Sequence, residues 1–193
     1  MLYSIAEIFY SIQGEGRNTG MPAWFIRLAG CNKNCRWCDT DHSPKVELNE
    51  FQIMEQLKTS YCKNAVITGG EPTIQDLIPL LRILKKEKYY VALETNGTND
   101  LMPYKRECLL DWITVSPKTD DINPDAIVDE VKVIWPTEMD LKKVIQNIDA
   151  DYYYLQPLDD KNKESNIKSC VDVILENPKW RLSLQTQKIL QLR

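Results

Sequence analysis

The chain has 193 residues, 43% of them hydrophobic, and both values fit one globular domain with a substantial core, residues 1–193. Its net charge of −4 argues against a broad nucleic-acid surface, which would need a surplus of Lys and Arg. No apolar run approaches the roughly 18 residues of a membrane helix, and the first residues lack the features of a signal peptide. We therefore expect a cytoplasmic protein with no membrane partner, in which the six cysteines stay reduced.

Short segments rich in β-branched and aromatic residues alternate with segments of helical periodicity. Strands are expected at residues 5–12, 24–28, 65–68, 90–93, 112–115, 131–134, 152–155 and 181–184. Helices are expected at 50–60, 74–86, 139–147 and 166–176, with a shorter one at 100–108. This alternation predicts βαβ units and a parallel sheet. About six parallel strands are too few for a closed eight-stranded barrel, so we predict an α/β fold: an incomplete TIM-like barrel with helices outside.

Polar and glycine-containing segments follow the expected strands, at their carboxyl ends. These ends meet at one edge of a parallel sheet, where α/β enzymes place their active sites. The pattern therefore predicts a functional site at this edge. The segments are Gly69-Gly70-Glu71-Pro72, Glu94-Thr95-Asn96-Gly97, Ser116-Pro117-Lys118, Gln156-Pro157-Leu158-Asp159 and Gln185-Thr186-Gln187.

Three cysteines, Cys31, Cys35 and Cys38, form a C-x3-C-x2-C motif directly after the expected strand at 24–28. Three thiolates can bind three irons of a four-iron cluster and leave the fourth iron open to a substrate or cofactor. Spacing alone leaves two alternatives open: a zinc site completed by His42, and a redox pair made of Cys35 and Cys38. The zinc alternative lacks a second C-x2-C pair, and the redox alternative leaves Cys31 without a role.

The cysteine motif, with Trp37 before its last cysteine and the Gly-Gly-Glu-Pro segment farther on, resembles the radical S-adenosylmethionine superfamily. The resemblance implies that the open iron binds the amino and carboxylate groups of S-adenosylmethionine (SAM). The cluster would then donate an electron and break the sulfonium bond, and the resulting deoxyadenosyl radical would abstract hydrogen from the substrate. We assign no catalytic side chain, since this chemistry belongs to the cluster and the cofactor.

A closer resemblance, to the family of 7-carboxy-7-deazaguanine synthases, extends over nearly the whole chain. It implies conversion of 6-carboxy-5,6,7,8-tetrahydropterin to 7-carboxy-7-deazaguanine by radical ring contraction with loss of ammonia, in queuosine and deazapurine biosynthesis. It also implies Mg²⁺, a flavodoxin-type electron donor and a homodimer. The segments that carry the resemblance are Ser11-Ile12-Gln13-Gly14-Glu15-Gly16, Phe25-Ile26-Arg27-Leu28-Ala29-Gly30-Cys31, Trp37-Cys38-Asp39-Thr40, Thr68-Gly69-Gly70-Glu71-Pro72, Glu94-Thr95-Asn96-Gly97 and Ser116-Pro117-Lys118.

The same resemblance implies which residues form the site. Cys31, Cys35 and Cys38 would bind the cluster, and Thr40 would bind Mg²⁺ together with substrate carboxylate and water. The cofactor positions are Trp37, Cys38, Asp39, Gly70, Ser116, Pro117, Lys118, Gln156, Pro157, Leu158 and Asp159. The substrate positions are Ile12, Gln13, Gly14, Glu15, Arg27 and Thr68.

Two of the substrate positions also have a chemical reason. The Glu15 carboxylate can accept hydrogen bonds from the guanidine-like edge of a pterin. Arg27 lies on an otherwise apolar strand, where an unpaired charge is costly to bury, and arginine binds carboxylates in a bidentate manner. For Thr40 and the 12–14 segment the residues alone favour ordinary turns, so their roles rest on the resemblance.

The C-terminus departs from this family, which commonly has Gln-Thr-His-Lys where this chain has Gln185-Thr186-Gln187-Lys188. Gln187 can form hydrogen bonds but cannot take a charge, so the residue does not support a proton-transfer role there. Three hypotheses follow: a radical lyase acting on a pterin, an activating enzyme for a glycyl-radical protein, and a zinc-stabilised binding module. Arg27, Thr40 and the 13–15 segment favour a small-molecule substrate, and therefore the lyase.

Overall fold

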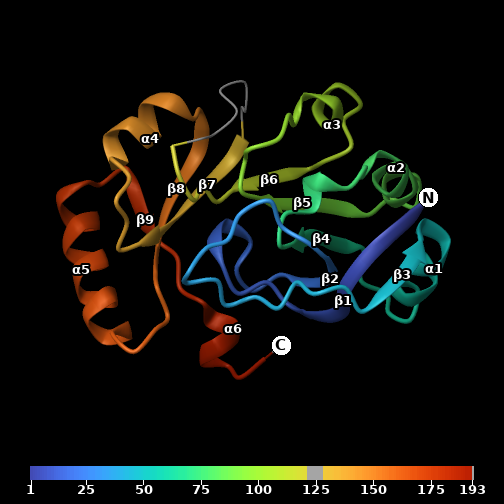
Figure 1. Cartoon of the computed structure of the whole chain (residues 1–193), viewed down its shortest axis with the longest axis horizontal. Coiled ribbons are helices and arrows are strands. Elements are labelled where there is room, and N and C mark those ends of the chain that lie inside the picture. Colours follow the sequence, from blue (N-terminus) through green and yellow to red (C-terminus); the bar gives the residue numbers. More distant parts are fainter. Residues whose placement is uncertain (121–127, 193) are drawn as a thin grey trace.

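The computed structural model describes residues 1–120 and 128–192. Within these residues one curved sheet holds nine strands in the order β3-β1-β2-β4-β5-β6-β7-β8-β9 (Figure 1). Strands β2 and β4 to β9 are parallel, whereas β1 pairs antiparallel with both β2 and β3. The strands are β1 (Leu2–Ile12), β2 (Pro22–Leu28), β3 (Val46–Asn49), β4 (Asn64–Gly69), β5 (Tyr90–Thr95), β6 (Trp112–Val115), β7 (Val128–Trp135), β8 (Ala150–Pro157) and β9 (Trp180–Leu182).

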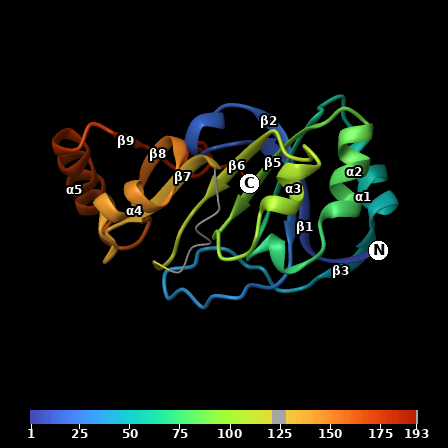
Figure 2. The same cartoon turned by 90° about the horizontal axis from the view of Figure 1, so that it is seen from above.

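The longer helices cover the outside of the sheet, α1 to α3 on the side of β1–β6 and α4 and α5 beside β7–β9 (Figure 2). No helix in the described part of the chain is both long and apolar enough to cross a membrane. The helices are α1 (Glu50–Leu57), α2 (Ile78–Lys86), α3 (Met102–Arg106), α4 (Leu141–Asn147), α5 (Lys163–Glu176) and α6 (Thr186–Ile189), with 3-10 turns η1 (Gly16–Asn18) and η2 (Pro72–Ile74).

The predicted α/β fold with an incomplete barrel is confirmed, because the strand order is open, with β3 and β9 at the two ends of the sheet. The prediction of about six parallel strands was too low, since the described residues contain seven. Two elements were missed, the short strand β3 and the short helix α6. The strand expected at 181–184 begins one residue earlier and ends at Leu182.

Two helix boundaries show how local hydrogen bonds override periodicity. Asn49 caps α1 as a capping box with Gln52: each side chain accepts a hydrogen bond from the other residue's backbone, both 2.9 Å long. Periodicity predicts the next helix from residue 74, but α2 begins at Ile78. The preceding residues instead form η2, and the Asp76 carboxylate accepts the hydrogen bond from the Ile78 backbone N–H at 3.1 Å.

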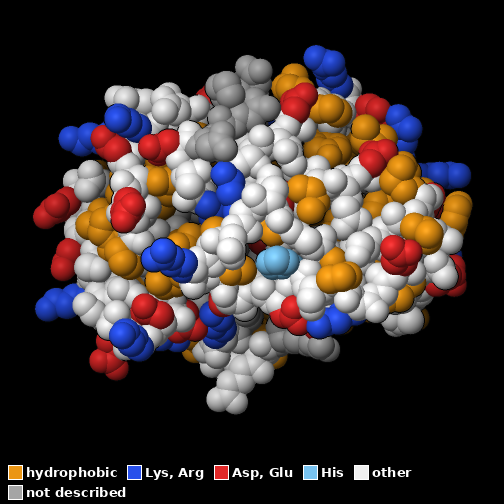
Figure 3. All heavy atoms as spheres, in the orientation of Figure 1, with side chains coloured by type: hydrophobic (Ala, Val, Ile, Leu, Met, Phe, Trp, Pro, Cys, Tyr) orange, Lys and Arg blue, Asp and Glu red, His pale blue; other side chains and the backbone are white. Residues whose placement is uncertain are grey.

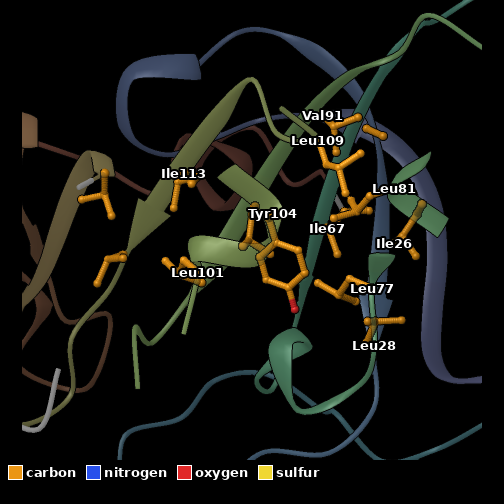
Figure 4. Packing of buried hydrophobic residues seen from close by; sticks show 14 of the residues in the cluster. Ile26, Leu28, Ile67, Leu77, Leu81, Val91, Leu101, Tyr104, Leu109 and Ile113 are labelled. Carbon is orange, nitrogen blue, oxygen red and sulfur yellow. The ribbon is translucent and has the colours of Figure 1, made fainter. Parts of the chain in front are cut away.

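The main hydrophobic core lies between the outer face of the sheet and the helices. Figure 4 shows Ile26, Ile67 and Val91 from three neighbouring strands meeting Leu81 of α2 and Tyr104 of α3. Because side chains alternate along a strand, the residues between these positions point to the opposite, concave face. There they begin as a small apolar layer, with Phe25, Val66 and Ala92, and become polar towards the carboxyl ends of the strands.

The turn after β4 is fixed by the buried carboxylate of Glu71, which has no exposed surface. One oxygen accepts hydrogen bonds from Thr73 N (3.0 Å), Thr73 Oγ1 (2.6 Å) and Thr95 Oγ1 (2.7 Å), and the other accepts from Asn96 N (2.6 Å). The Glu71 N–H donates to Gly30 O at 3.0 Å. One side chain therefore joins η2 to the end of β5, beside the loop that carries the three cysteines.

Replacing Glu71 with Gln is expected to lower the free energy of unfolding by about 3 kcal/mol. The amide NH2 would face at least one backbone or hydroxyl donor, so hydrogen bonds to a charged acceptor would be lost and a donor would be left unpaired. Urea unfolding under anaerobic conditions measures the change. Glu55→Gln is the matched control, because Glu55 pairs with Lys58 on the exposed surface and should contribute less than about 0.5 kcal/mol. Equal effects of the two substitutions would contradict the assignment.

Candidate functional site

A cavity of about 760 Å³ lies at the carboxyl ends of the parallel strands. Strand alternation explains its lining: Arg27 follows Phe25 on β2, Thr68 follows Val66 on β4, and Glu94 follows Ala92 on β5. The sheet register places Arg27 opposite Thr68 and Glu94 opposite Thr114. Neighbouring parallel strands thus contribute one polar layer to the floor of the cavity.

The structure brings together nearly all of the residues predicted for the site. Pro117 is the exception: it is buried and does not line the cavity, although Ser116 and Lys118 on either side of it do. The predicted residues that line the cavity are Ile12, Gln13, Gly14, Glu15, Arg27, Cys31, Cys35, Trp37, Cys38, Asp39, Thr40, Thr68, Gly70, Ser116, Lys118, Gln156, Pro157, Leu158 and Asp159.

The three cysteines lie on the cysteine loop, which we define as residues 29–45 between β2 and β3. Their thiols are free, and the other three cysteines, Cys62, Cys108 and Cys170, lie outside the cavity lining. Burial raises the pKa of the Cys35 thiol, and the nearby Cys38 and Cys31 thiols raise it further, while Lys118 and Lys33 oppose the shift. Three soft donors with no fourth cysteine fit a four-iron cluster that keeps one iron open.

Gly70 packs directly against the cysteine loop. A Cβ placed on Gly70 would lie 2.2 Å from Gly30 O and 2.7 Å from Cys31 Cβ, so any side chain there would push the loop away. The absence of a side chain keeps the backbone of the Gly-Gly-Glu-Pro turn beside the first cysteine. The turn can therefore offer main-chain groups to a ligand bound at the cysteines.

Lys118 brings a positive charge to the same end of the cavity. Its Nζ donates to Ser116 Oγ at 2.7 Å and lies 5.1 Å from the centre of the Trp37 ring. Burial lowers the pKa of Lys118, and the charge of Lys132 lowers it further, while Cys35 and Glu15 oppose the shift. The charge of Lys118 thus opposes the rise that burial causes in the pKa of the Cys35 thiol.

In the same cavity a buried ion pair joins Glu15 to Lys132 of β7. The other oxygen of Glu15 accepts hydrogen bonds from Gln185 Nε2 (3.0 Å) and Gln187 Nε2 (2.9 Å). Burial acts to raise the pKa of Glu15, but the charge of Lys132 and these hydrogen bonds lower it to about 2. Burial likewise acts to lower the pKa of Lys132, and Glu15 reverses the effect and raises it. Lys132 and the two amides thus favour the carboxylate form of Glu15.

Glu130 lies on β7 two residues before Lys132, and its side chain is buried, with 2% of the residue exposed. Its carboxylate accepts a hydrogen bond from Arg17 N at 2.9 Å, and a Cβ on Gly16, whose φ is +65°, would lie 2.0 Å from it. Burial raises the pKa of Glu130 to about 7, the charge of Lys132 and the Arg17 hydrogen bond oppose this, and the charge of Glu94 adds to it. Glu130 thus holds the β1–β2 loop, residues 13–21, against the concave face of the sheet.

The remaining polar residues of the floor are arranged around Glu94 and Arg27. Glu94 accepts hydrogen bonds from Gln13 Nε2 at 2.8 Å and from Thr68 Oγ1 at 3.2 Å, so it organises two of the predicted substrate positions. Arg27 lies 3.6 Å from the Glu7 carboxylate, and its guanidinium stacks 5.7 Å from the centre of the Phe9 ring. This long ion pair leaves guanidinium donors of Arg27 available to an anion in the cavity.

Comparison with known proteins identifies the family. The radical SAM superfamily profile matches residues 25–150. The chain is 37% identical over 193 residues to the 7-carboxy-7-deazaguanine synthase of Bacteroides thetaiotaomicron, covering all of both chains. It is 38% identical to the synthase of Neisseria meningitidis serogroup B, covering 96% of this chain and 92% of that one. The crystal structure of QueE from Escherichia coli superposes with a TM-score of 0.79 at 29% identity, covering 96% and 94% of the two chains.

The chain belongs to the 7-carboxy-7-deazaguanine synthase family of the radical SAM superfamily. Membership implies a [4Fe-4S] cluster and SAM, and it agrees with the donor set on the cysteine loop. It favours the radical lyase over the two other hypotheses, the activating enzyme and the zinc-stabilised module. The resemblance read from the sequence is thereby confirmed.

Sequence reasoning missed Lys132, a buried charge in the cavity lining, and Glu130, which lies two residues before it on β7. A signal was present: on the expected strand at 131–134 and its flank, Glu130 and Lys132 alternate with Val131 and Val133. In a strand covered by helices on one side, that alternation places both charges on the concave face. What could not be read from the chain is that Glu15, more than a hundred residues earlier, supplies the counter-charge.

The raised pKa of Glu130 predicts a pH dependence of stability. The folded-state value of about 7 lies above the ordinary value of 4.5, so the folded state retains this proton while the unfolded chain loses it. The group is therefore destabilising, and its contribution grows as pH rises from 4.5 to 7. Glu130→Gln removes this titration. The difference in free energy of unfolding, variant minus wild type, should therefore increase by about 2 kcal/mol from pH 5 to pH 8. Urea unfolding at both pH values tests this; parallel curves for the two proteins would contradict it.

Proposed function

We propose that the chain converts 6-carboxy-5,6,7,8-tetrahydropterin to 7-carboxy-7-deazaguanine, with loss of ammonia, in deazapurine biosynthesis. The observation that carries the proposal is one cavity lined both by three free thiols and by the Glu15, Arg27 and Thr68 side chains. A cluster-bound cofactor and a flat polar substrate can share this space. Family membership supports the same reaction.

Cys31, Cys35 and Cys38 would hold the cluster. The cofactor would lie among Trp37–Asp39, Gly70, Ser116, Lys118 and Gln156–Asp159, which line the cavity together with the cysteines. When bound, the cluster would supply the electron that cleaves SAM and so starts hydrogen abstraction. The chain's own contribution is the cation of Lys118, the open backbone at Gly70 and the exclusion of water.

Arg27 would bind the substrate carboxylate, and the 12–15 segment would bind the pterin ring. Arg27 is suited to this because its ion pair with Glu7 is long, at 3.6 Å. Glu15 keeps its negative charge and can accept hydrogen bonds from the amino-pyrimidine edge. Thr68 and Gln13, both held by Glu94, complete the polar floor. Orienting the substrate in this way is what the protein contributes to the rate.

We further propose that Thr40 is a ligand of Mg²⁺. Its hydroxyl lies 3.3 Å from Asp39 Oδ1, at the edge of the cavity. A single hydroxyl would need substrate carboxylate and water to complete the ion, which is the usual situation for Mg²⁺. The flavodoxin-type electron donor and the homodimer stay predictions.

Thr40→Ala should reduce the stimulation of activity by Mg²⁺ by about tenfold, because the metal would lose its direct protein ligand. Iron content should equal that of wild type, since no cysteine is changed. Initial rates measured over a series of Mg²⁺ concentrations test the assignment. Thr59→Ala, at an exposed hydroxyl bonded to Gln56 O after α1, is the matched control. Unchanged Mg²⁺ stimulation in Thr40→Ala would refute the role.

Anaerobic reconstitution followed by mass spectrometry tests the reaction itself. Wild type supplied with SAM, Mg²⁺, reductant and the tetrahydropterin should release deoxyadenosine and 7-carboxy-7-deazaguanine. Cys35→Ala should release neither, with at least a hundredfold loss of rate to about the background level, because two thiolates cannot hold a working cluster. Cys108→Ala, at an exposed thiol outside the cavity, should retain both products. Turnover only in the presence of a protein substrate would instead support an activating enzyme.

A further inference from the structure

Four consecutive residues near the C-terminus, 185–188, join loops that lie on different sides of the cavity. We call them the C-terminal clasp; three of them begin α6, near the C-terminal end of the chain in Figure 1. The clasp contacts the β1–β2 loop, the cysteine loop and the segment that ends β8. The first of these loops carries proposed substrate residues, and the other two carry proposed cofactor residues.

Two residues of the clasp bind the β1–β2 loop. Thr186 donates to Gly14 O twice, from its backbone N–H at 3.1 Å and from Oγ1 at 2.7 Å. Gln187 Nε2 donates to Glu15 Oε1 at 2.9 Å. A Cβ on Gly14 would lie 1.8 Å from Gln187 Oε1, so glycine at position 14 leaves the space in which this amide packs.

Gln187 is oriented by the charge of Glu15. Only its NH2 can face a carboxylate, so its Oε1 points the other way, and that atom is buried without a hydrogen-bond partner in the described part of the chain. A neutral amide at this position therefore donates to Glu15 at every pH. A titrating side chain could not do this.

Lys188 binds the other two loops. Its Nζ lies 2.7 Å from Asp39 Oδ2 on the cysteine loop and 3.1 Å from Asp159 Oδ2 after β8. Burial acts to raise the pKa of Asp39, but the hydrogen bond and charge of Lys188 lower it. One ammonium group thus holds together two segments that flank the proposed SAM position.

Of the four clasp residues, Gln185 connects the β1–β2 loop to the cysteine loop through its side chain. Its Nε2 donates to Glu15 Oε1 at 3.0 Å and to Asp39 Oδ2 at 3.2 Å, so the two hydrogens of one amide bridge two carboxylates. Because both neighbours are acceptors, the amide has a single possible orientation. The bridge also separates like charges, since the charge of Glu15 acts to raise the pKa of Asp39.

We propose that Gln185 is a positioning residue for both ligands: it holds Glu15 in place for the pterin and Asp39, beside Cys38 and Thr40, in place for SAM. Gln187 serves the pterin alone, and Lys188 serves SAM alone. The inference rests on the proposed function, because it uses the ligands assigned there. It predicts a pattern across three variants that a general loosening of the C-terminus would not produce.

The test is equilibrium binding to the reconstituted holoenzyme, with Mg²⁺ and without reductant, so that no turnover occurs. Isothermal titration calorimetry measures Kd separately for SAM and for the tetrahydropterin. Gln185→Leu should weaken both ligands by about 3- to 10-fold, the loss of one hydrogen bond to a charged partner for each. Gln187→Leu should weaken only the pterin and Lys188→Met only SAM, by similar factors, and Lys188→Arg should restore SAM binding.

Two controls separate positioning from damage to the fold. Each variant should have the iron content and urea midpoint of wild type, and Gln146→Leu, the same substitution at an exposed position of α4, should change neither Kd. If Gln185→Leu weakens one ligand or none, or if all three variants weaken both ligands alike, the inference is overturned. If wild type binds neither ligand, the proposed function fails and the inference fails with it.

Discussion

The site depends on the ion pair between Glu15 and Lys132, which joins the β1–β2 loop to β7. The parallel sheet ends at β9 and does not return to β2, so its concave face is covered by the β1–β2 loop and not by a further strand. Burying either charge alone would be strongly unfavourable, and losing one partner of such a pair typically costs roughly 3–5 kcal/mol. The pair therefore holds the β1–β2 loop to β7 in the cavity wall, because separating its members would leave a buried charge unpaired.

A second set of contacts, around Glu71 and Gly70, shapes the cavity beside the cysteine loop. Glu71 accepts four hydrogen bonds while its own N–H reaches Gly30 O, and Gly70 lies against Cys31 with no space for a side chain. These interactions bring the ends of β4 and β5 to the cysteine loop. The two sets of contacts thus use different physics. Glu71 is held by neutral donors and close backbone packing, whereas Glu15 is held by a compensating charge in a region of low dielectric.

Hydrogen-bonding capacity explains why so many amides surround these charges. Three carboxylates accept hydrogen bonds from glutamine side chains. Glu15 accepts from both Gln185 and Gln187, and Asp39 accepts from Gln185. Glu94 accepts from Gln13. An amide donor stabilises a carboxylate without adding a charge and without titrating near neutral pH. For Glu15 and Asp39 these hydrogen bonds help to lower the pKa of the carboxyl group. Glu130 differs because it lies deeper, has one backbone donor, and is destabilised by the charge of Glu94.

The amino-acid sequence by itself determined the order of strands and helices, the carboxyl edge on which the site lies, and the three thiols, because these follow from local period and from spacing along the chain. It also carried the family resemblance, and all but one of the residues transferred on that basis line the same cavity. Only the tertiary structure decided which charges meet. Nothing in the spacing of Glu15, Lys132 and Gln185 shows that they are neighbours, since their contact depends on how the β1–β2 loop crosses the concave face and where the C-terminal residues return. Short elements such as β3 and α6 escaped prediction for the same reason: their stability comes from partners far away in the chain and not from a pattern of their own.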